Sequence, residues 1–420
     1  MAFGRLRRFE AGLALIVVGA AGIRLAHVLA VAPHTTGLYD AYWFSRVGAD
    51  VAHGRGFVVP IGSFFSPDFH YAPTAGHPPL YALWLALLFK LGIAGDLTQR
   101  AMGTLLGAGT VLLVGLLGRR VGGDRMGLVA ASIAALSPLL IAADGALLSE
   151  TLYGTLSALV LLVAWSFTRR PTLGRAALLG ACTALAALTR AEALLLVLVL
   201  FIPVALQVGT GRRWLLFGTS VACMAVVLAP WVIRNWNVFG RPLLATDDGT
   251  VLVGANNHRA YYGRDIGFWI SGLPHPGGNE AQAEDVRRSK ALRYARDHAG
   301  RVPVVVAARV LREWSFFQPF RLEEQGRSKR VQALGAFYDW LLIVLAVAGA
   351  VFLRRRGTPL RVLIAPVWLV TLAAALGYGL VRMREPAELS LSLLAAAGLL
   401  GFWDHRRARR RAVAKAAPPG

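Results

Sequence analysis

The sequence is built from ten long apolar runs that alternate with short arginine-rich segments. A helix that crosses the hydrocarbon core of a bilayer needs about 20 mostly apolar residues, or somewhat fewer where flanking side chains reach the headgroups. The runs that approach this length are Ala11–Val31, Ala101–Leu117, Met126–Ala142, Leu152–Phe167, Ala176–Leu188, Leu194–Val208, Trp214–Ile233, Ala336–Leu353, Leu360–Leu380 and Ala387–Trp403. They predict an all-α polytopic membrane protein with about ten transmembrane helices.

Composition excludes the main alternatives to a membrane protein. Hydrophobic residues make up 56% of the 420 residues and charged residues only 16%, and the mean hydropathy is +0.53. A soluble chain cannot bury so many apolar side chains. The formal net charge of +22 does not indicate a nucleic-acid partner, because the arginines cluster between apolar runs without aromatic motifs for stacking bases. Cys182 and Cys223 each lie inside an apolar run, which indicates neither a metal site nor a disulfide.

The arginine clusters orient the predicted helices, because positively charged loops stay on the cytoplasmic side of a membrane. The clusters are Arg119/Arg120/Arg125, Arg169/Arg170/Arg175, Arg212/Arg213, Arg354–Arg356 and Arg406–Arg411. All of them fall on the inner side if the shorter apolar run Pro79–Leu91 is an interfacial helix rather than a span. We therefore predict a plasma-membrane protein with both termini cytoplasmic. The first apolar run also fits a cleaved signal peptide, but the many spans that follow favour an uncleaved helix.

The topology divides the chain into four parts. They are an N-terminal catalytic membrane module (1–234, with its first outer loop at 32–100), a long extracytoplasmic loop (235–335), C-terminal transmembrane helices (336–403) and a basic cytoplasmic tail (404–420). We expect interfacial helices in the first outer loop and disorder in the tail. No internal repeat recurs along the chain, so the inverted-repeat pattern of many transporters is missing.

The long second outer loop carries two helical patterns. Glu280–His298 is polar, and Val302–Trp314 is amphipathic with Arg309 and Arg312 on its polar face. We expect both helices to lie on the outer leaflet.

Four arginines break the orientation rule, because they stand at predicted outer ends of helices. They are Arg190, Arg234, Arg382 and Arg384. Ionisable side chains at membrane depth are costly, and they face a cavity or pair with one another. One interpretation is an anion site for a lipid phosphate, held by charge-assisted and often bidentate hydrogen bonds. The other is that two of them pair with the neighbouring acids Glu192 and Glu385, while the rest reach the outer headgroups.

Two acidic residues fall on the same predicted side as these arginines. Asp40 follows the first apolar run, and Glu150 precedes the fourth, with Asp144 as a competitor for the second position. Each acid could simply cap the helix that follows it. A carboxylate can also take a proton from an attacking hydroxyl while fixed cations stabilise a departing phosphate. The combination indicates displacement of a phosphate at a sugar carbon, and Asp40 and Glu150 are the only candidate metal ligands.

His77 stands where the first loop returns to the membrane, in His77-Pro78-Pro79. Its imidazole could bind a phosphate or anchor the turn. The motifs of zinc proteases, P-loop ATPases, serine hydrolases and dinucleotide-binding proteins are missing from the sequence, so nothing supports those activities.

Short pieces of the sequence occur in an order and spacing that match a known family. They are Tyr39-Asp40-Ala41-Tyr42, Gly54-Arg55-Gly56-Phe57, His77-Pro78-Pro79-Leu80-Tyr81, Leu148-Ser149-Glu150-Thr151-Leu152, Leu185–Ala193, Pro230–Asn235, Val238–Pro242, Gly254–Asn257 and Arg382–Ala387. With these pieces the chain resembles the C-type (GT-C) polyprenyl-phosphate-dependent membrane glycosyltransferases, in the group related to protein O-mannosyltransferases and the lipid A aminoarabinose transferase. The pieces extend over nearly the whole chain.

The resemblance implies a GT-C-like bundle with a catalytic cleft on the non-cytoplasmic side, a polyprenyl-phosphate sugar as donor and inversion at the anomeric carbon. It gives Asp40 the role of general base, and Glu150 a role in positioning the substrate or a metal. His77 departs from the pattern, since the aminoarabinose transferase has a lysine there near the lipid phosphate. No large C-terminal soluble domain follows in the sequence, so acceptor binding of the kind found in protein-modifying relatives is not expected.

We therefore expect an integral-membrane glycosyltransferase that moves a hexose or pentose from a polyprenyl-phosphate donor to a cell-envelope glycan or lipid on the extracytoplasmic face. Asp40 would deprotonate the acceptor hydroxyl, and Glu150 would orient the sugar or share a divalent cation, the one candidate cofactor. The phosphate would be held by Arg234, Arg382 and Arg384, with Arg190 and His77 as further candidates.

Two rival functions remain at this stage. A transporter or flippase of a phosphorylated lipid would also use outer arginines, but it needs polar residues near the bilayer midplane. Arg24 in the first span is the main exception to an apolar midplane, and we expect it to reach the outer interface. A non-catalytic scaffold in an envelope-assembly complex predicts that Asp40 and Glu150 point apart.

Overall fold

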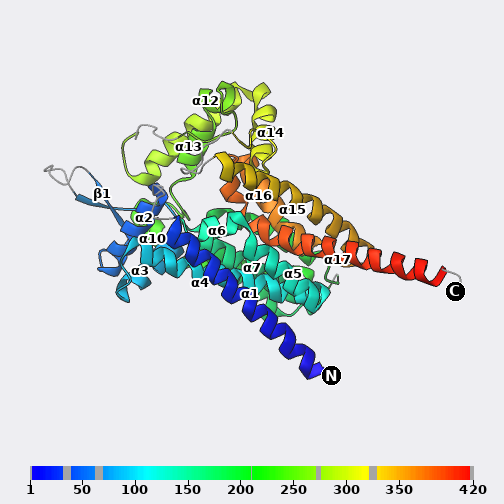
Figure 1. Ribbon diagram of the computed structural model, residues 1–420. Coiled ribbons are helices and arrows are strands. Elements are labelled where there is room, and N and C mark those ends of the chain that lie inside the picture. Colours follow the sequence, from blue (N-terminus) through cyan, green and yellow to red (C-terminus); the bar gives the residue numbers. More distant parts are fainter. Residues whose placement is uncertain are drawn as a thin grey trace.

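The computed structural model describes residues 2–31, 39–61, 70–209, 211–270, 276–320 and 329–416, and most of them are helical. Long helices form one bundle, and shorter helices with a single β-ribbon gather at one end of it (Figure 1). The two termini extend away from the layer of short elements (Figure 1). The predicted loops and tail are covered only in part, because residues 32–38, 62–69, 271–275, 321–328 and 417–420 lie outside the described ranges.

Each of the ten predicted apolar runs falls on helices of the bundle. These are α1 (Ala2–Ala30), α4 (Asp96–Gly122), α5 (Asp124–Leu136), α6 (Pro138–Asp144), α7 (Glu150–Arg169), α8 (Leu173–Ala187), η2 (Ala191–Leu195), η3 (Val197–Phe201), α9 (Ile202–Ala205), α10 (Arg213–Phe239), α15 (Lys329–Arg355), α16 (Arg361–Leu376) and α17 (Glu385–Ala416). The polytopic all-α class is confirmed.

Fewer than ten helices reach full spanning length. Within the described residues six are long and apolar enough to cross a bilayer, and the pair α5–α6, bent by 60°, gives a seventh. The other three predicted runs coincide with shorter apolar helices, namely α8, the segment Ala191–Ala205 and α16. Within the segment Ala191–Ala205 the backbone passes from a 3-10 turn into a π-helical turn before α9.

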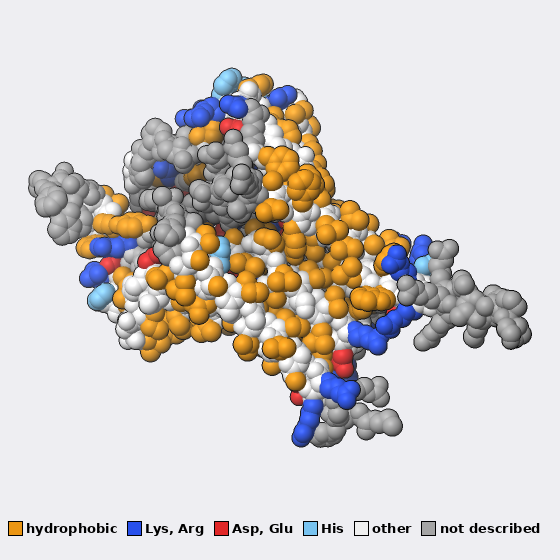
Figure 2. All heavy atoms as spheres, viewed as in Figure 1, with side chains coloured by type: hydrophobic (Ala, Val, Ile, Leu, Met, Phe, Trp, Pro, Cys, Tyr) orange, Lys and Arg blue, Asp and Glu red, His pale blue; other side chains and the backbone are white. Residues whose placement is uncertain are grey.

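Small residues let the helices of the bundle pack closely, which is typical of membrane helices. A Cβ on Gly118 of α4 would stand 3.0 Å from the Cα of Gly127 in α5. Between α15 and α17, a Cβ on Gly349 would collide with the carbonyl of Leu394. Hydrophobic side chains cover the flanks of the bundle, whereas Lys and Arg side chains gather at its ends (Figure 2). This distribution fits helices that face lipid along their length.

The layer of short elements comes from the two long loops. The first loop gives α2 (Tyr39–Ala52), the strands β1 (Val58–Ile61) and β2 (His70–Pro73), and α3 (Leu80–Lys90); the second gives α11 (Asp248–Ala255), α12 (His258–Tyr262), α13 (Glu280–Asp297), η4 (Ala299–Arg301) and α14 (Val302–Glu313). The strands form an antiparallel ribbon in which Val58 lies opposite Pro73. This ribbon was not expected from the sequence.

The run Pro79–Leu91 forms the short helix α3, as predicted. Its 11 residues span about 16 Å at 1.5 Å per residue, which is too short to cross a bilayer. One face of α3 is buried against α2, with Leu85 and Leu88 in a shared apolar cluster with Phe44 and Val47.

Two predictions about the loops and tail were wrong. Arg309 and Arg312 do not form an exposed polar face on α14, because both are buried and donate hydrogen bonds to the carbonyls of Ala255 and Ile266. The tail is not disordered from residue 404 onward, because α17 continues as a helix to Ala416.

Candidate functional site

A cavity of about 570 Å³ opens where the first loop, the end of α8 and the turn before α17 meet. Its polar lining residues are Asp40, His77, Ser149, Thr189, Arg190, Glu192, Asp247, Asp248, Arg288, Tyr378 and Arg382. Its apolar wall includes Leu194, Leu195, Val251, Leu252, Ala373, Ala374 and Leu376. Four predicted site residues (Asp40, His77, Arg190 and Arg382) therefore share one cavity.

Asp40 lies in the first turn of α2, where the helix dipole favours an acid. Its Oδ2 accepts a hydrogen bond from Nη2 of Arg382 at 3.0 Å, and its side chain remains 34% exposed. Burial alone would raise the pKa of Asp40, but the charges of His77, Arg382 and Arg190 outweigh it and hold the pKa below its usual value. Asp40 is therefore an ionised carboxylate with access to the cavity.

Glu150, the first residue of α7, lies just behind the cavity wall and joins the two cavity arginines. Its Oε1 lies 3.2 Å from Nη1 of Arg190 and 3.7 Å from Nη1 of Arg382. Arg190 also donates to Glu192, with Nε 3.0 Å from Oε1. Opposite charges thus alternate through Asp40, Arg382, Glu150, Arg190 and Glu192. These five side chains comprise three carboxylates and two guanidinium groups.

The two cavity arginines stand at similar breaks in the backbone. Arg190 is extended (φ −147°, ψ 122°) between the end of α8 and η2. Leu380 has almost the same conformation (φ −146°, ψ 122°) before η6 (Val381–Arg384), which carries Arg382. Gly379 precedes this break, and a Cβ there would collide with the carbonyl of Arg309. Two helix interruptions therefore direct arginines into one space.

Arg382 retains hydrogen-bonding capacity. Its Nε and Nη1 have no hydrogen-bond acceptor among the described residues. Oε1 of Glu150 likewise has no hydrogen-bond donor among them. Buried polar groups are rarely left unpartnered, and such groups are expected where a ligand binds. The Arg382 guanidinium therefore has N–H donors that its contact with Asp40 does not use.

His77 links the two loops over the cavity. Its ring stacks on Phe44 and meets Trp43 edge-on, at centroid distances of 4.9 and 4.7 Å, and its Nδ1 lies 3.3 Å from Oδ2 of Asp247. Burial would lower the pKa of His77, but its hydrogen bond and charge interaction with Asp247, together with Asp40, raise it above the ordinary value. These contacts fit the interpretation that His77 anchors the turn, and its binding of a phosphate stays a prediction.

Arg234 and Arg384 do not line the cavity. Arg234 donates to the carbonyls of Thr74 and Phe57 and lies over the rings of Trp231 and Phe239, so it ties the first loop to α10. Arg384 is fully buried and pairs with Asp339 and Glu388. The predicted pairing of Arg384 with Glu385 does not occur among the contacts of the described residues.

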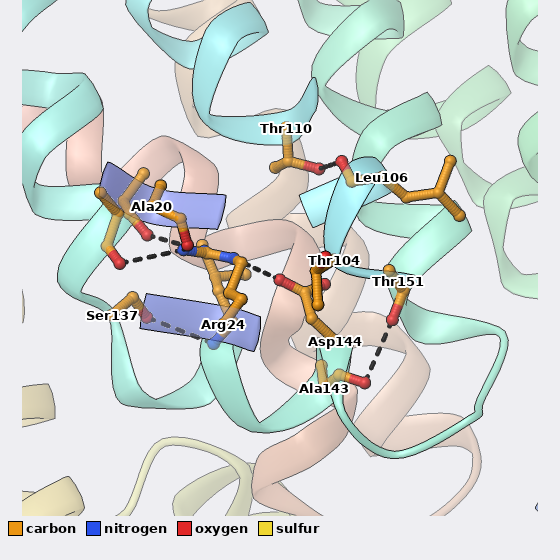
Figure 3. A network of polar contacts seen from close by, with 12 residues as sticks. Ala20, Arg24, Thr104, Leu106, Thr110, Ser137, Ala143, Asp144 and Thr151 are labelled. Atoms are coloured by element: carbon orange, nitrogen blue, oxygen red, sulfur yellow. Dashed lines mark hydrogen bonds and ion pairs between the residues drawn. The ribbon is translucent and has the colours of Figure 1, made fainter. Parts of the chain in front are cut away.

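Asp144 does not line the cavity either, and Figure 3 shows it beside Arg24. It is buried, and its Oδ2 accepts a hydrogen bond of 2.5 Å from Nε of Arg24. Arg24 further donates to the carbonyls of Ala20, Ala134 and Ala135. The expectation that Arg24 reaches the outer interface is therefore wrong, because its charge is neutralised inside the bundle. Between the two competing acids, Glu150 is the one in contact with the cavity arginines.

The described residues contain no group of three or more His, Cys, Asp or Glu side chains that could hold a metal. Asp40 and Glu150 are bridged by Arg382, whose guanidinium lies where a shared cation would be needed. As arranged, the two carboxylates do not fit a divalent ion, and the cation stays a prediction.

Several cavity residues were not selected from the sequence. Asp247 and Asp248 begin α11 and resemble ordinary acids at a helix start, and Tyr378 precedes the turn with Arg382. Burial raises the pKa of Asp248 to about 6. The only signal was proximity in sequence to the pieces that carry the family resemblance.

The sequence and the fold were compared with those of known proteins. The family model described as dolichyl-phosphate-mannose-protein mannosyltransferase matches residues 76–236. No curated protein sequence matches the chain.

Solved structures give the likeness over the full chain. The archaeal oligosaccharyltransferase AglB from Archaeoglobus fulgidus, in complex with an inhibitory peptide and a dolichol-phosphate, matches with a TM-score of 0.59 and 14% identity, over 99% of this chain and 53% of that chain. An Archaeoglobus fulgidus oligosaccharyltransferase in the apo form matches with a TM-score of 0.57 and 14% identity, over 96% of this chain and 52% of that chain. ArnT from Cupriavidus metallidurans bound to undecaprenyl phosphate gives a TM-score of 0.42 and 15% identity, over 95% and 78%.

The predicted resemblance and fold are confirmed by these findings. The chain has the GT-C-like membrane fold, at an identity that establishes the fold alone. It spans about half the length of the oligosaccharyltransferase that it matches.

Proposed function

We propose that this GT-C-fold membrane protein transfers a sugar from a polyprenyl-phosphate donor to a hydroxyl of a cell-envelope glycan or lipid on the extracytoplasmic face. The observation that carries the proposal is the cavity itself, which holds an ionised, accessible carboxylate beside two arginines. The family description names a dolichyl-phosphate sugar, and the AglB complex contains dolichol-phosphate, which supports a donor of this class. The arginine clusters at the opposite helix ends support the outward orientation.

The donor phosphate would bind between Arg190 and Arg382. Guanidinium groups suit phosphate, because their planar N–H groups can bind two oxygens at once. Nε and Nη1 of Arg382 have no hydrogen-bond acceptor among the described residues, and His77 lines the same cavity from the facing loop. The lipid chain would leave along the apolar wall that Leu194, Leu195 and Leu376 help to form. One cavity would thereby accommodate both ends of a lipid phosphate.

Asp40 would act as the general base. It takes the proton from the acceptor hydroxyl as that oxygen forms the new bond to the anomeric carbon, while the bond from that carbon to the phosphate oxygen breaks. Polyprenyl phosphate leaves with the electron pair, and the growing charge on its oxygen is stabilised by Arg382 and Arg190. Attack opposite the leaving group inverts the anomeric carbon.

Binding of the donor would also strengthen the base. A carboxylate whose pKa is held down by Arg382 is a weak proton acceptor. When the phosphate takes over the Arg382 guanidinium, Asp40 loses a cationic partner and gains a negative neighbour, so its pKa rises. Asp40 would therefore become an effective base only in the donor complex.

Glu150 would serve as a positioning residue. It contacts both arginines and does not line the cavity. Its carboxylate would hold the two guanidinium groups at the separation that a phosphate requires. This assignment replaces direct contact with the sugar as its proposed role.

The decisive experiment uses the purified full chain in proteoliposomes, supplied with radiolabelled polyprenyl-monophosphate hexoses and pentoses and an envelope extract as acceptor. We expect label in a new glycosidic product, and Asp40→Asn should reduce the rate by about 10²–10⁴-fold, the usual contribution of a general base. Asp404→Asn is the matched control, because Asp404 is an exposed residue of α17 that does not line the cavity. Both variants should retain the thermal stability of the wild type.

Two results would overturn the proposal. Full activity of Asp40→Asn would remove the base assignment. Movement of labelled lipid between leaflets without a new glycosidic bond would favour the rival function of a transporter or flippase.

A further inference from the structure

A second hollow lies at the other end of α7 from Glu150. Its volume is about 310 Å³, and its lining residues are Arg120, Trp165, Ser166, Arg169, Arg170 and Arg175. The 20 residues of α7 separate it from the sugar-transfer cavity by about 30 Å at 1.5 Å per residue. The hollow, which we call the basic pocket, therefore lies outside the proposed active site.

Three helix ends build the basic pocket. They are the last turn of α4, the last turn of α7 and the first turn of α8, and a short connection joins α7 to α8. Trp165 is buried, and the guanidinium of Arg169 lies over its ring at 5.3 Å. Arg175 donates to the carbonyls of Ser166 and Arg170, which fixes the turn between the helices. The pocket is thus a defined part of the fold.

The charges of the basic pocket are not neutralised. Within the described parts of the chain, none of its four arginines forms an ion pair with a carboxylate, whereas the adjacent Arg119 pairs with Asp124 at 2.9 Å. Like charges around one hollow repel each other. Positive-inside topology accounts for arginines at this end of the helices, but it does not require four of them to converge on a hollow with a buried indole.

We propose that the basic pocket binds a phosphate group, supplied by the headgroup of an anionic membrane lipid. Several guanidinium groups around one hollow provide the multiple N–H donors that phosphate oxygens accept. Basic pockets between the ends of membrane helices, at headgroup depth, suit anionic lipid headgroups. A soluble phosphate compound shares this chemistry, and the experiment separates the two sources.

The test uses the full chain, purified in detergent and stripped of lipid. Thermal unfolding is followed while phosphatidylglycerol, phosphatidylcholine or inorganic phosphate is added. The pocket variant is Arg120→Gln/Arg169→Gln, which removes two exposed guanidinium groups without touching the Arg175 contacts. The matched control is Arg354→Gln/Arg355→Gln, which removes the same charge from exposed arginines at the last turn of α15.

We expect phosphatidylglycerol to stabilise the wild type and phosphatidylcholine to have little effect. The half-saturating concentration of phosphatidylglycerol should rise about tenfold in the pocket variant, as for the loss of one or two charge-assisted hydrogen bonds. It should stay unchanged in the control. Stabilisation by inorganic phosphate with the same dependence on the variants would support the phosphate site and assign it a soluble ligand.

Equal effects of the two phospholipids would overturn the proposal. So would an equal loss of binding in the pocket variant and the control, because that result would mean a general attraction to the basic end of the bundle. Unfolding temperatures of the lipid-free variants show whether each is folded, so that a folding defect is not mistaken for lost binding.

Discussion

Arg382 and Arg384 stand two residues apart on η6, yet they belong to different kinds of charged region. Arg382 is 16% exposed and bridges Asp40 and Glu150 at the cavity. Arg384 is 0% exposed and pairs with Asp339 and Glu388, at 2.6 and 3.0 Å, between α15 and α17. Both regions combine arginine with an excess of carboxylates. Only one of them can be reached by a ligand.

The difference shows that enclosure decides what an arginine at a helix end can do. A cation beside a cavity can exchange a carboxylate for a substrate phosphate, because water and ligand reach it. A buried cation cannot, since its separation from its acids would leave uncompensated charges in a low-dielectric interior. Arg382 is thus suited to binding, and Arg384 to holding the turn that presents Arg382.

The largest effect is expected from Arg384→Gln. This substitution leaves Asp339 and Glu388 buried without a cation, and breaking a buried ion pair costs about 3–5 kcal/mol of folding stability. The variant should unfold at a much lower temperature in detergent, or fail to accumulate in the membrane. A second variant, Arg384→Gln/Glu388→Gln, should recover part of the stability because one uncompensated charge is removed.

The comparison would break if Arg384→Gln had the thermal stability of the wild type but no transferase activity. That result would mean that Arg384 takes part in the reaction, and that its role is not only to hold the turn that presents Arg382.

The next largest effect is expected from Arg382→Gln. The loss of one preorganised donor to a developing anion typically costs about 10²–10³-fold in rate. Stability should fall less than in Arg384→Gln, because Asp40 can be hydrated in the absence of the Arg382 guanidinium and Glu150 keeps Arg190 as a partner. Measured kcat and KM for the donor in proteoliposomes, together with the unfolding temperature, would separate the two effects.

Arg241→Gln is the matched control, since Arg241 is an exposed arginine of the second long loop that pairs with Asp285. A rate near that of the wild type for Arg382→Gln would contradict the phosphate-binding role, whatever its stability.

Sequence reasoning identified the membrane class and the charged residues, but it could not separate Arg382 from Arg384. The apolar runs are local, so the helices could be predicted from them one at a time. The site depends on contacts between distant segments: the ion pair between Asp40 and Arg382 joins residues 342 positions apart. Two residues apart on the 3-10 turn η6, the side chains of Arg382 and Arg384 point in different directions. Which of them faces the cavity depends on how η6 packs on α14 and α17.

The same limit explains the other differences. Arg234 satisfied the outer-arginine pattern but is used to bind backbone carbonyls of the first loop. Asp247 matched no motif, yet it reaches His77 from the second loop. Apolar content alone also did not show that α8 and α16 end short of full spanning length.

The smallest effect is a displacement of pH profiles, and it follows from the lowered pKa of Asp40. The acid limb of kcat/KM reports the free enzyme and that of kcat the substrate complex. In the free enzyme His77, Arg382 and Arg190 keep Asp40 ionised below its usual pKa, so kcat/KM should fall only at low pH. In the complex the phosphate engages Arg382, the pKa of Asp40 rises, and kcat should fall at a higher pH.

Arg382→Gln should move the acid limb of kcat/KM upward toward that of kcat, because one of the cations that lower the pKa of Asp40 is gone, and Arg241→Gln should leave both limbs in place. The folding stability of the wild type should also decrease at low pH. The contribution of the ion pair is present above the unfolded pKa of about 3.9 and is lost as pH falls through the lower folded pKa, and it is reduced because water reaches the partly exposed Asp40. Identical acid limbs for kcat and kcat/KM in the wild type would mean that the donor does not compete with Asp40 for Arg382. Arg382 would then hold the structure of the site, as Arg384 does, and would not bind the donor phosphate.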